Sequence, residues 1–306
     1  MWTKPYDMKE GFLIGGGLIF AGLMLELSVG PVDWDAFRWP VNGVVLAGFL
    51  ALIAIIFLLR KRVYGFQFIG TYKAAIPALV YAVVLTIVMG LTRQAVDGVW
   101  LNNMLSFWPF VLIYVYIAVI LGQIILRRAL NSKLSSLNLK RDIPFLLNHL
   151  GLFLAMTTAT LGNADMQRLK MITVKGEPEW RALTSQQQIV EMPIAIELKE
   201  FIMETYDDGS PRRFASDIHI LTTSGKNIQT TVEVNKPVEV DGWKIYQYGY
   251  DTQMGAMSQT SILELVSDPW LPLVYTGIYM MLAGAVCMFL FGGKKKIVNR
   301  KSSNSK

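Results

Sequence analysis

Histidine is the residue type in this sequence best suited to metal chemistry, and the 306 residues contain only two of them. One of the two, His149, lies in the apolar stretch 144–161, which is typical of a membrane-spanning helix. An imidazole in hydrocarbon costs free energy unless it has a partner, so it is a functional candidate by default. Neutral imidazole is also the commonest protein ligand of metals. His149 is therefore the leading candidate for a metal ligand, and a hydrogen bond to a neighbouring helix is the alternative.

The residues around His149 predict a shallow position near the start of a helix. Pro144 suits the first turn, and at 1.5 Å rise per residue His149 would lie roughly 7–8 Å further along. The helix dipole at such a position disfavours the imidazolium and leaves a neutral nitrogen able to bind a metal. Beside it, Asn148 could hydrogen-bond to another helix, and Gly151 leaves room for a second helix or a large planar ligand.

The second histidine and the single cysteine are weaker candidates. His219 lies in a segment with strand-like alternation and is predicted to be solvated or to contact a loop, without ligating a metal. Cys287 lies in the last apolar stretch, where a free thiol usually packs as a small apolar group. The sequence contains no CxxCH motif, no HExxH motif and no phosphate-binding loop, so soluble-enzyme chemistry finds no support.

The composition is that of a membrane protein. Hydrophobic residues make up 53% of the chain, charged residues 17%, and the mean hydropathy is +0.38. Apolar stretches of about 20 residues can each cross a hydrocarbon core of roughly 30 Å. Six such spans are predicted, at 11–29, 41–59, 74–92, 106–126, 144–162 and 270–291.

The basic residues predict the orientation of these spans. Lys and Arg cluster before the first span, between the second and third, between the fourth and fifth, and after the sixth. The two short loops on the other side carry only Arg38 and Arg93. By the positive-inside rule both termini are cytoplasmic and the segment 163–267 is extracytoplasmic. The net charge of +6 therefore reflects membrane orientation, and no nucleic-acid partner is expected.

The segment 163–267 changes from helical to strand-like periodicity. Residues 164–171 look like an amphipathic continuation of the fifth span, and 176–187 are polar and predicted as loop. Period-two alternation then predicts strands at 193–201, 214–223, 227–234, 238–250 and 258–266. Turn signals at Ser224-Gly225 and Asp241-Gly242 favour antiparallel pairing.

The predicted fold is a polytopic α-helical membrane protein of about six transmembrane helices, with a small antiparallel β-rich extracytoplasmic domain between the last two. The predicted domains are a four-span N-terminal region with cytoplasmic loops (1–143), a fifth transmembrane helix (144–162), the β-rich domain (163–267), a sixth transmembrane helix (268–292) and a basic cytoplasmic tail (293–306).

Two groups of residues resemble the ResB (CcsB) family of cytochrome c biogenesis. The first is Phe145-Leu-Leu-Asn-His149-Leu-Gly-Leu-Phe-Leu-Ala, which runs into Leu161-Gly-Asn-Ala-Asp165. The second comprises Arg213 to Ile220, Val234 to Val238, Gly242 to Tyr248 and Ser267-Asp268-Pro269, followed by the final span. The resemblance covers about residues 140–291 and also implies the β-rich domain. Familiar members often have a larger extracytoplasmic region and fewer preceding spans.

The resemblance implies that the chain handles haem in the System II pathway. It implies a CcsA-type partner, apocytochrome c as the acceptor, and haem bound transiently and shared with that partner. His149 would be the haem axial ligand, with Asn148 and Gly151 near the cofactor. The chain would be a subunit of a cytochrome c haem lyase (synthase) complex, not a self-sufficient enzyme, in the bacterial inner membrane.

The residues also leave open a second class of function. The chain could be a non-catalytic membrane scaffold or receptor that binds a protein through its β-rich domain, with His149 only packing between helices. A solute transporter is disfavoured, because the sequence shows neither repeat symmetry nor several buried charges.

Overall fold

The computed structural model describes residues 4–95, 98–131 and 139–291, so the predicted tail 293–306 lies outside the described residues. The chain divides into two compact units. A helical unit contains the residues up to Ala164 together with those from Leu271 onward, and a β unit contains Asp165–Trp270.

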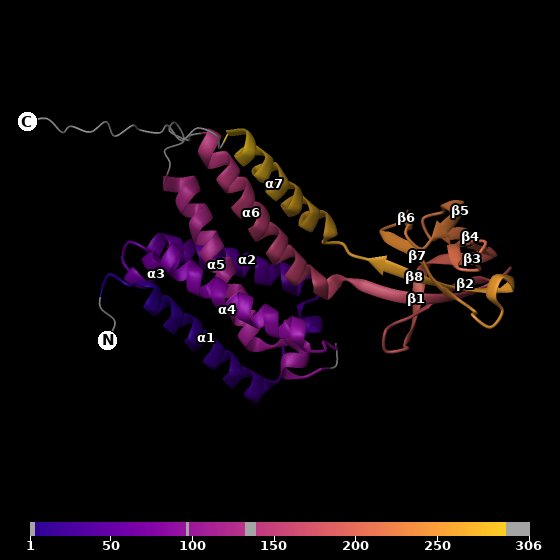
Figure 1. Cartoon of the computed structure of the whole chain (residues 1–306), viewed down its shortest axis with the longest axis horizontal. Coiled ribbons are helices and arrows are strands. Elements are labelled where there is room, and N and C mark those ends of the chain that lie inside the picture. Colours follow the sequence, from indigo (N-terminus) through magenta and orange to yellow (C-terminus); the bar gives the residue numbers. More distant parts are fainter. Residues whose placement is uncertain (1–3, 96–97, 132–138, 292–306) are drawn as a thin grey trace, which may run out of the picture. The chain divides into compact units, whose positions relative to one another are not determined.

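Six helices of the helical unit are long and apolar enough to cross a membrane, as predicted (Figure 1). They are α1 (Met8–Val29), α2 (Val41–Leu59), α4 (Tyr72–Leu91), α5 (Trp108–Asn131), α6 (Leu139–Gly162) and α7 (Leu271–Phe291). Shorter helical segments connect them, namely η1 (Trp34–Phe37), α3 (Tyr64–Ile69) and η2 (Trp100–Ser106), and η4 (Asn163–Asp165) leads from α6 into the β unit. The chain is therefore a multi-pass membrane protein.

Helix α5 is the most buried of the six and packs against α1, α2, α4 and α6. Glu26 of α1 is buried, and its carboxylate accepts the backbone N–H of Trp108, the first residue of α5, at 3.1 Å. A carboxylate at a helix N-terminus satisfies a free N–H and complements the helix dipole. On the opposite flank, Phe153 of α6 stacks on Phe49 of α2 with ring centroids 6.3 Å apart. These contacts join α1 to α5 and α2 to α6, and α5 and α6 also contact each other directly.

The β unit is one antiparallel sheet of eight strands in the order β5-β4-β3-β2-β1-β8-β7-β6. The strands are β1 (Gln167–Val174), β2 (Pro178–Leu183), β3 (Ile189–Thr205), β4 (Pro211–Thr222), β5 (Asn227–Glu233), β6 (Val238–Val240), β7 (Trp243–Tyr250) and β8 (Thr260–Ser267). Because β1 to β8 lie between α6 and α7, the predicted fold class is confirmed.

Two sequence-based assignments in the β unit were wrong. Residues 164–171, predicted as a helical continuation, include the start of β1, and 176–187, predicted as loop, include β2. In β1 the buried Leu169 and Met171 alternate with exposed residues, but so short a run fits either period. In β2 only Ala182 is fully buried, so the pattern is too polar to predict a strand. Backbone pairing with β1 and β3 stabilises it instead.

One face of the sheet is buried and forms a single core, to which all eight strands contribute. Its most buried large side chains are Met171, Ile194, Ile196, Leu198, Ile218, Ile220, Ile245, Leu263 and Leu265. The sheet curls so that its end strands β5 and β6 contact each other (Figure 1). Lys226 and Asp241, in the turns after β4 and β6, form an ion pair of 2.6 Å across this closure. The predicted turns at Gly225 and Gly242 are confirmed, with φ of 84° and 82°.

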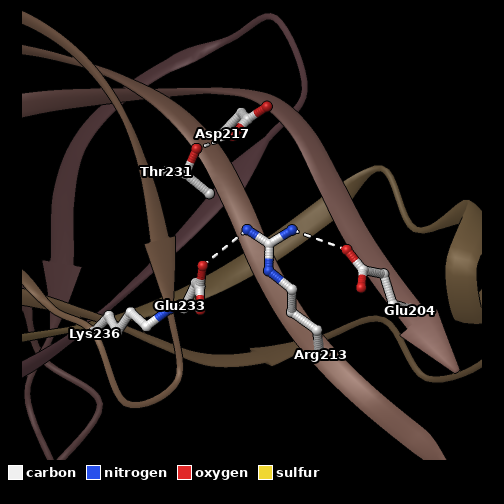
Figure 2. A network of polar contacts seen from close by, with 6 residues as sticks. All are labelled: Glu204, Arg213, Asp217, Thr231, Glu233 and Lys236. Carbon is white, nitrogen blue, oxygen red and sulfur yellow. Dashed lines mark hydrogen bonds and ion pairs between the residues drawn. The ribbon is translucent and has the colours of Figure 1, made fainter. Parts of the chain in front are cut away.

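An ion-pair network crosses strands β3, β4 and β5 on the surface of this sheet. Figure 2 shows the guanidinium of Arg213 between Glu204 and Glu233, at 2.9 and 2.8 Å, with Lys236 also bound to Glu233. The hydrogen bond from Arg213 lowers the pKa of Glu233, and Lys236 lowers it further. The network therefore links the side chains of three neighbouring strands.

A second surface ion pair lies on β2, and its effect on hydrogen-exchange protection of that strand is expected to disappear in acid. The guanidinium of Arg181 hydrogen-bonds Glu179 and lowers the pKa of that carboxyl to about 2. The folded-state pKa thus lies below the unfolded value of about 4.3, so the pair stabilises the fold above that pH and loses its effect as the pH falls toward 2. Arg181→Gln should therefore lower hydrogen-exchange protection of β2 at neutral pH, and the difference from the unmodified protein should vanish near pH 2. A difference that does not change with pH would contradict this expectation.

Candidate functional site

The start of α6 differs from the prediction. The helix begins at Leu139, so Pro144 lies inside it and His149 lies well beyond the first turn. The helix dipole acts mainly within the first turn, so the dipole argument for a neutral imidazole was wrong. The charged residues before Pro144 gave no sign of this extension in the sequence. One of them, Asp142, is buried in an ion pair with Arg128 of α5.

A hydrogen bond sets the tautomer of the neutral His149 ring. Its Nδ1 lies 2.9 Å from the carbonyl oxygen of Phe145, one turn earlier in α6. A carbonyl only accepts, so in the neutral ring Nδ1 carries the hydrogen and Nε2 carries the free lone pair. Among the described residues, Nε2 has no hydrogen-bonding partner. The imidazole also stacks on the Phe145 ring, with centroids 3.9 Å apart and planes 22° apart, which holds its orientation.

Two charged residues lie beside this histidine. Arg128 donates from Nη2 to Oδ1 of Asp142, and its guanidinium carbon lies 5.5 Å from the centre of the Phe145 ring. Phe145 therefore contacts Arg128 and His149 at once. We refer to Arg128, Asp142, Phe145 and His149 as the α5–α6 cluster. It combines a cation, an anion, a flat apolar ring and a ring nitrogen without a hydrogen-bonding partner among the described residues.

The other two predicted cofactor-binding residues face a different helix. A Cβ at Gly151 would lie 2.6 Å from the carbonyl oxygen of Gly277 in α7, and a Cβ at Gly284 would lie 2.4 Å from Nδ2 of Asn148. These glycines let α6 and α7 pack closely, side by side as in Figure 1. Asn148 also donates to the carbonyl of Pro144 at 2.8 Å. The structure thus brings Asn148 and Gly151 together with α7, and not with the α5–α6 cluster.

His219 lies on β4 with both ring nitrogens engaged. Nε2 is 2.6 Å from Oδ1 of Asn227, and Nδ1 is 3.5 Å from Oε2 of Glu197. The bond to His219 also contributes to the lowered pKa of Glu197, after the larger effect of Lys199. His219 lies on a strand as predicted, but it contacts the neighbouring strands β3 and β5 and its side chain is only 17% exposed, so the prediction that it is solvated or contacts a loop was wrong. These contacts leave His149 as the histidine with an available nitrogen.

Sequence reasoning missed Arg128 and Asp142 as neighbours of His149. Arg128 counted only among the basic residues between the fourth and fifth spans, and Asp142 was given no role. The available signal was the spacing of Asp142, Phe145 and His149, which puts them on one face of a helix that begins before Pro144.

Comparison with known proteins shows which family part of this chain resembles. Residues 140–262 match the ResB-like family. The cytochrome c biogenesis protein CcsB of Prochlorococcus marinus subsp. pastoris is 27% identical over 116 residues, which are 38% of this chain and 26% of that protein. The match thus covers about a quarter of the relative's length. The solved structure of the cytochrome c haem lyase CcmF aligns with 94% of this chain and 46% of its own, at 15% identity and a TM-score of 0.38, a likeness too low to carry an argument.

Proposed function

Since residues 140–262 match the ResB-like family, we propose that this chain takes part in cytochrome c biogenesis as a haem-handling membrane subunit. It works with a CcsA-type partner to deliver haem for covalent attachment to apocytochrome c, as one subunit of a cytochrome c haem lyase complex. The name of the CcsB relative supports the pathway. Haem is the cargo in this proposal and is held only transiently.

The observation that carries the proposal is the free Nε2 of His149. A metal-ligating histidine usually donates its other ring N–H to a carbonyl or carboxylate, which fixes the tautomer and makes the free nitrogen a better ligand. The bond from Nδ1 to the Phe145 carbonyl meets this requirement. Haem iron accepts imidazole as an axial ligand, and apolar rings suit the porphyrin. The residues present therefore fit haem, with His149 as the axial ligand.

The charge distribution supports a location in the bacterial inner membrane. The clusters of Lys and Arg put both termini in the cytoplasm and the segment 163–267 outside it. The α5–α6 cluster would then lie toward the cytoplasmic side, where haem is made. The β unit would face the partner and apocytochrome c.

One observation favours the alternative of a protein-binding scaffold. A shallow depression of about 250 Å³ on the β unit is lined by Ile172, Glu179, Arg181, Ala182, Leu183 and Ile189. Ile189 is 67% exposed, so an apolar side chain is open to solvent at this depression. A protein partner could cover it whether or not His149 binds haem.

The visible spectrum of the purified full chain, alone and with a CcsA-type partner, tests the proposal. We expect a Soret band from bound haem in the unmodified protein and its loss in His149→Ala. His219→Ala is the matched control, since it replaces the other histidine, and it should keep the band. Absence of haem from every preparation would refute the proposal and leave the scaffold function.

A further inference from the structure

We propose that Arg128 binds a carboxylate of the haem whose iron His149 ligates, so that the α5–α6 cluster recognises both ends of an amphipathic cargo. This inference rests on the proposed function and adds the group that recognises the polar edge of haem. Phe145 lies in contact with both the guanidinium and the imidazole, so the two polar groups flank one flat apolar ring.

The first support is an unused donor on Arg128. Its Nη2 donates to Asp142, whereas its Nε is buried and has no hydrogen-bonding partner among the described residues. A buried donor without a partner is costly and uncommon in native proteins. Nε shares its edge of the guanidinium with Nη2, which Asp142 already engages, so the donors open to a ligand are those of Nη1, which has no hydrogen-bonding partner among the described residues. A ligand carboxylate would bind Nη1 through a charge-assisted hydrogen bond.

The second support is the difference in exposure within the ion pair. The side chain of Asp142 is 3% exposed, whereas that of Arg128 is 31% exposed. The anion is therefore enclosed by the protein, while part of the cation is reachable from outside. Asp142 would hold Arg128 in place and also compete with an incoming carboxylate for its positive charge.

The adjacent arginine provides a contrast. Arg127 donates from Nη1 to the carbonyl of Gly70 at 2.8 Å and from Nη2 to the carbonyl of Gln67. Its donors therefore tie α5 to the end of α3, on a different side of α5 from Arg128. Arg127 is thus a matched control of the same residue type at nearly the same depth.

The experiment compares haem with haem dimethyl ester, which keeps the iron and the porphyrin but lacks both free carboxylates. The full chain in detergent is titrated with each ligand, and affinities are taken from the Soret band. We expect the unmodified protein to bind haem about tenfold more tightly than the ester, the effect of one charge-assisted hydrogen-bonded pair.

Three variants then test which side chains cause the preference for haem over the ester. The double variant Arg128→Gln/Asp142→Asn leaves no lone buried charge and should bind both ligands with equal affinity. Asp142→Asn alone should raise the preference for haem, because it removes the competing carboxylate. Arg127→Lys should keep the unmodified preference.

The outcomes separate this inference from the proposed function. A Soret band that depends on His149 but shows equal affinity for haem and ester in the unmodified protein would overturn the inference and leave the proposed function intact. A haem preference that survives in the double variant, or that falls in Asp142→Asn, would overturn it as well. Failure of the unmodified protein to bind either ligand would refute both.

Discussion

Free imidazole is expected to restore the Soret band of a His149→Ala variant that has lost its haem. The substitution removes the axial ligand and should weaken haem binding by more than about 100-fold, since even the loss of a residue that supports a ligand costs 10- to 100-fold. The space left beside the Phe145 ring has the size of the imidazole that was removed. An added imidazole can remake the bond to the Phe145 carbonyl and present its other nitrogen to the iron.

The reagent N-methylimidazole distinguishes this reading from simple iron ligation. It has one nitrogen for the metal but no N–H for the Phe145 carbonyl, so it should restore haem less effectively than imidazole at equal concentration. Equal recovery with both reagents would show that the hydrogen bond at Nδ1 contributes nothing. His219→Ala, treated in the same way, should show no response to either reagent.

The long elements of the fold were predictable because their signal is strong. Spans such as α2 and α7 are unbroken apolar runs that only a membrane helix explains. Helix α6 is harder, since charged residues precede its apolar part and Pro144 predicts that the helix begins there. The polar start of α6 is stabilised by the ion pair of Asp142 with α5, which is a tertiary contact.

The short strands β1 and β2 show where the local residue pattern fails to predict a strand. Strand β2 lies between β1 and β3, so its backbone hydrogen bonds come from both neighbours. Those bonds do not depend on the side chains of β2, only one of which is fully buried. A strand held mainly by its backbone leaves little trace in the residue pattern.

The candidate site was predictable only in its central residue. His149 could be identified because it is a histidine in an apolar span. The partner of its Nδ1 could not, because it is a backbone carbonyl, which any residue at that position would supply. The pair of Arg128 and Asp142 joins residues 14 positions apart on different helices, a contact that single-sequence reasoning cannot foresee. That His149 ligates haem stays a prediction.

Alanine in place of Gly151 is expected to destabilise the helical unit by about 1–3 kcal/mol, as overpacking in a tight interface does. Its Cβ would lie 2.6 Å from the carbonyl oxygen of Gly277 and 3.0 Å from Cβ of Met280, so α6 and α7 must move apart. Thermal unfolding of the full chain in detergent measures the change. Gly48→Ala in α2 is the matched control, because a Cβ there meets nothing within 4 Å. It should stabilise the protein by up to about 1 kcal/mol through helix propensity alone.

The haem affinity of the folded Gly151→Ala variant decides between the two roles considered for this glycine. Gly151 faces α7 and the α5–α6 cluster faces α5, so a packing role predicts lower stability with nearly unchanged haem binding below the unfolding transition. A role in admitting the planar ligand predicts the reverse, a loss of affinity without a comparable loss of stability. The close contact between two glycine backbones makes the first result the expected one, because their mutual approach requires the absence of both side chains.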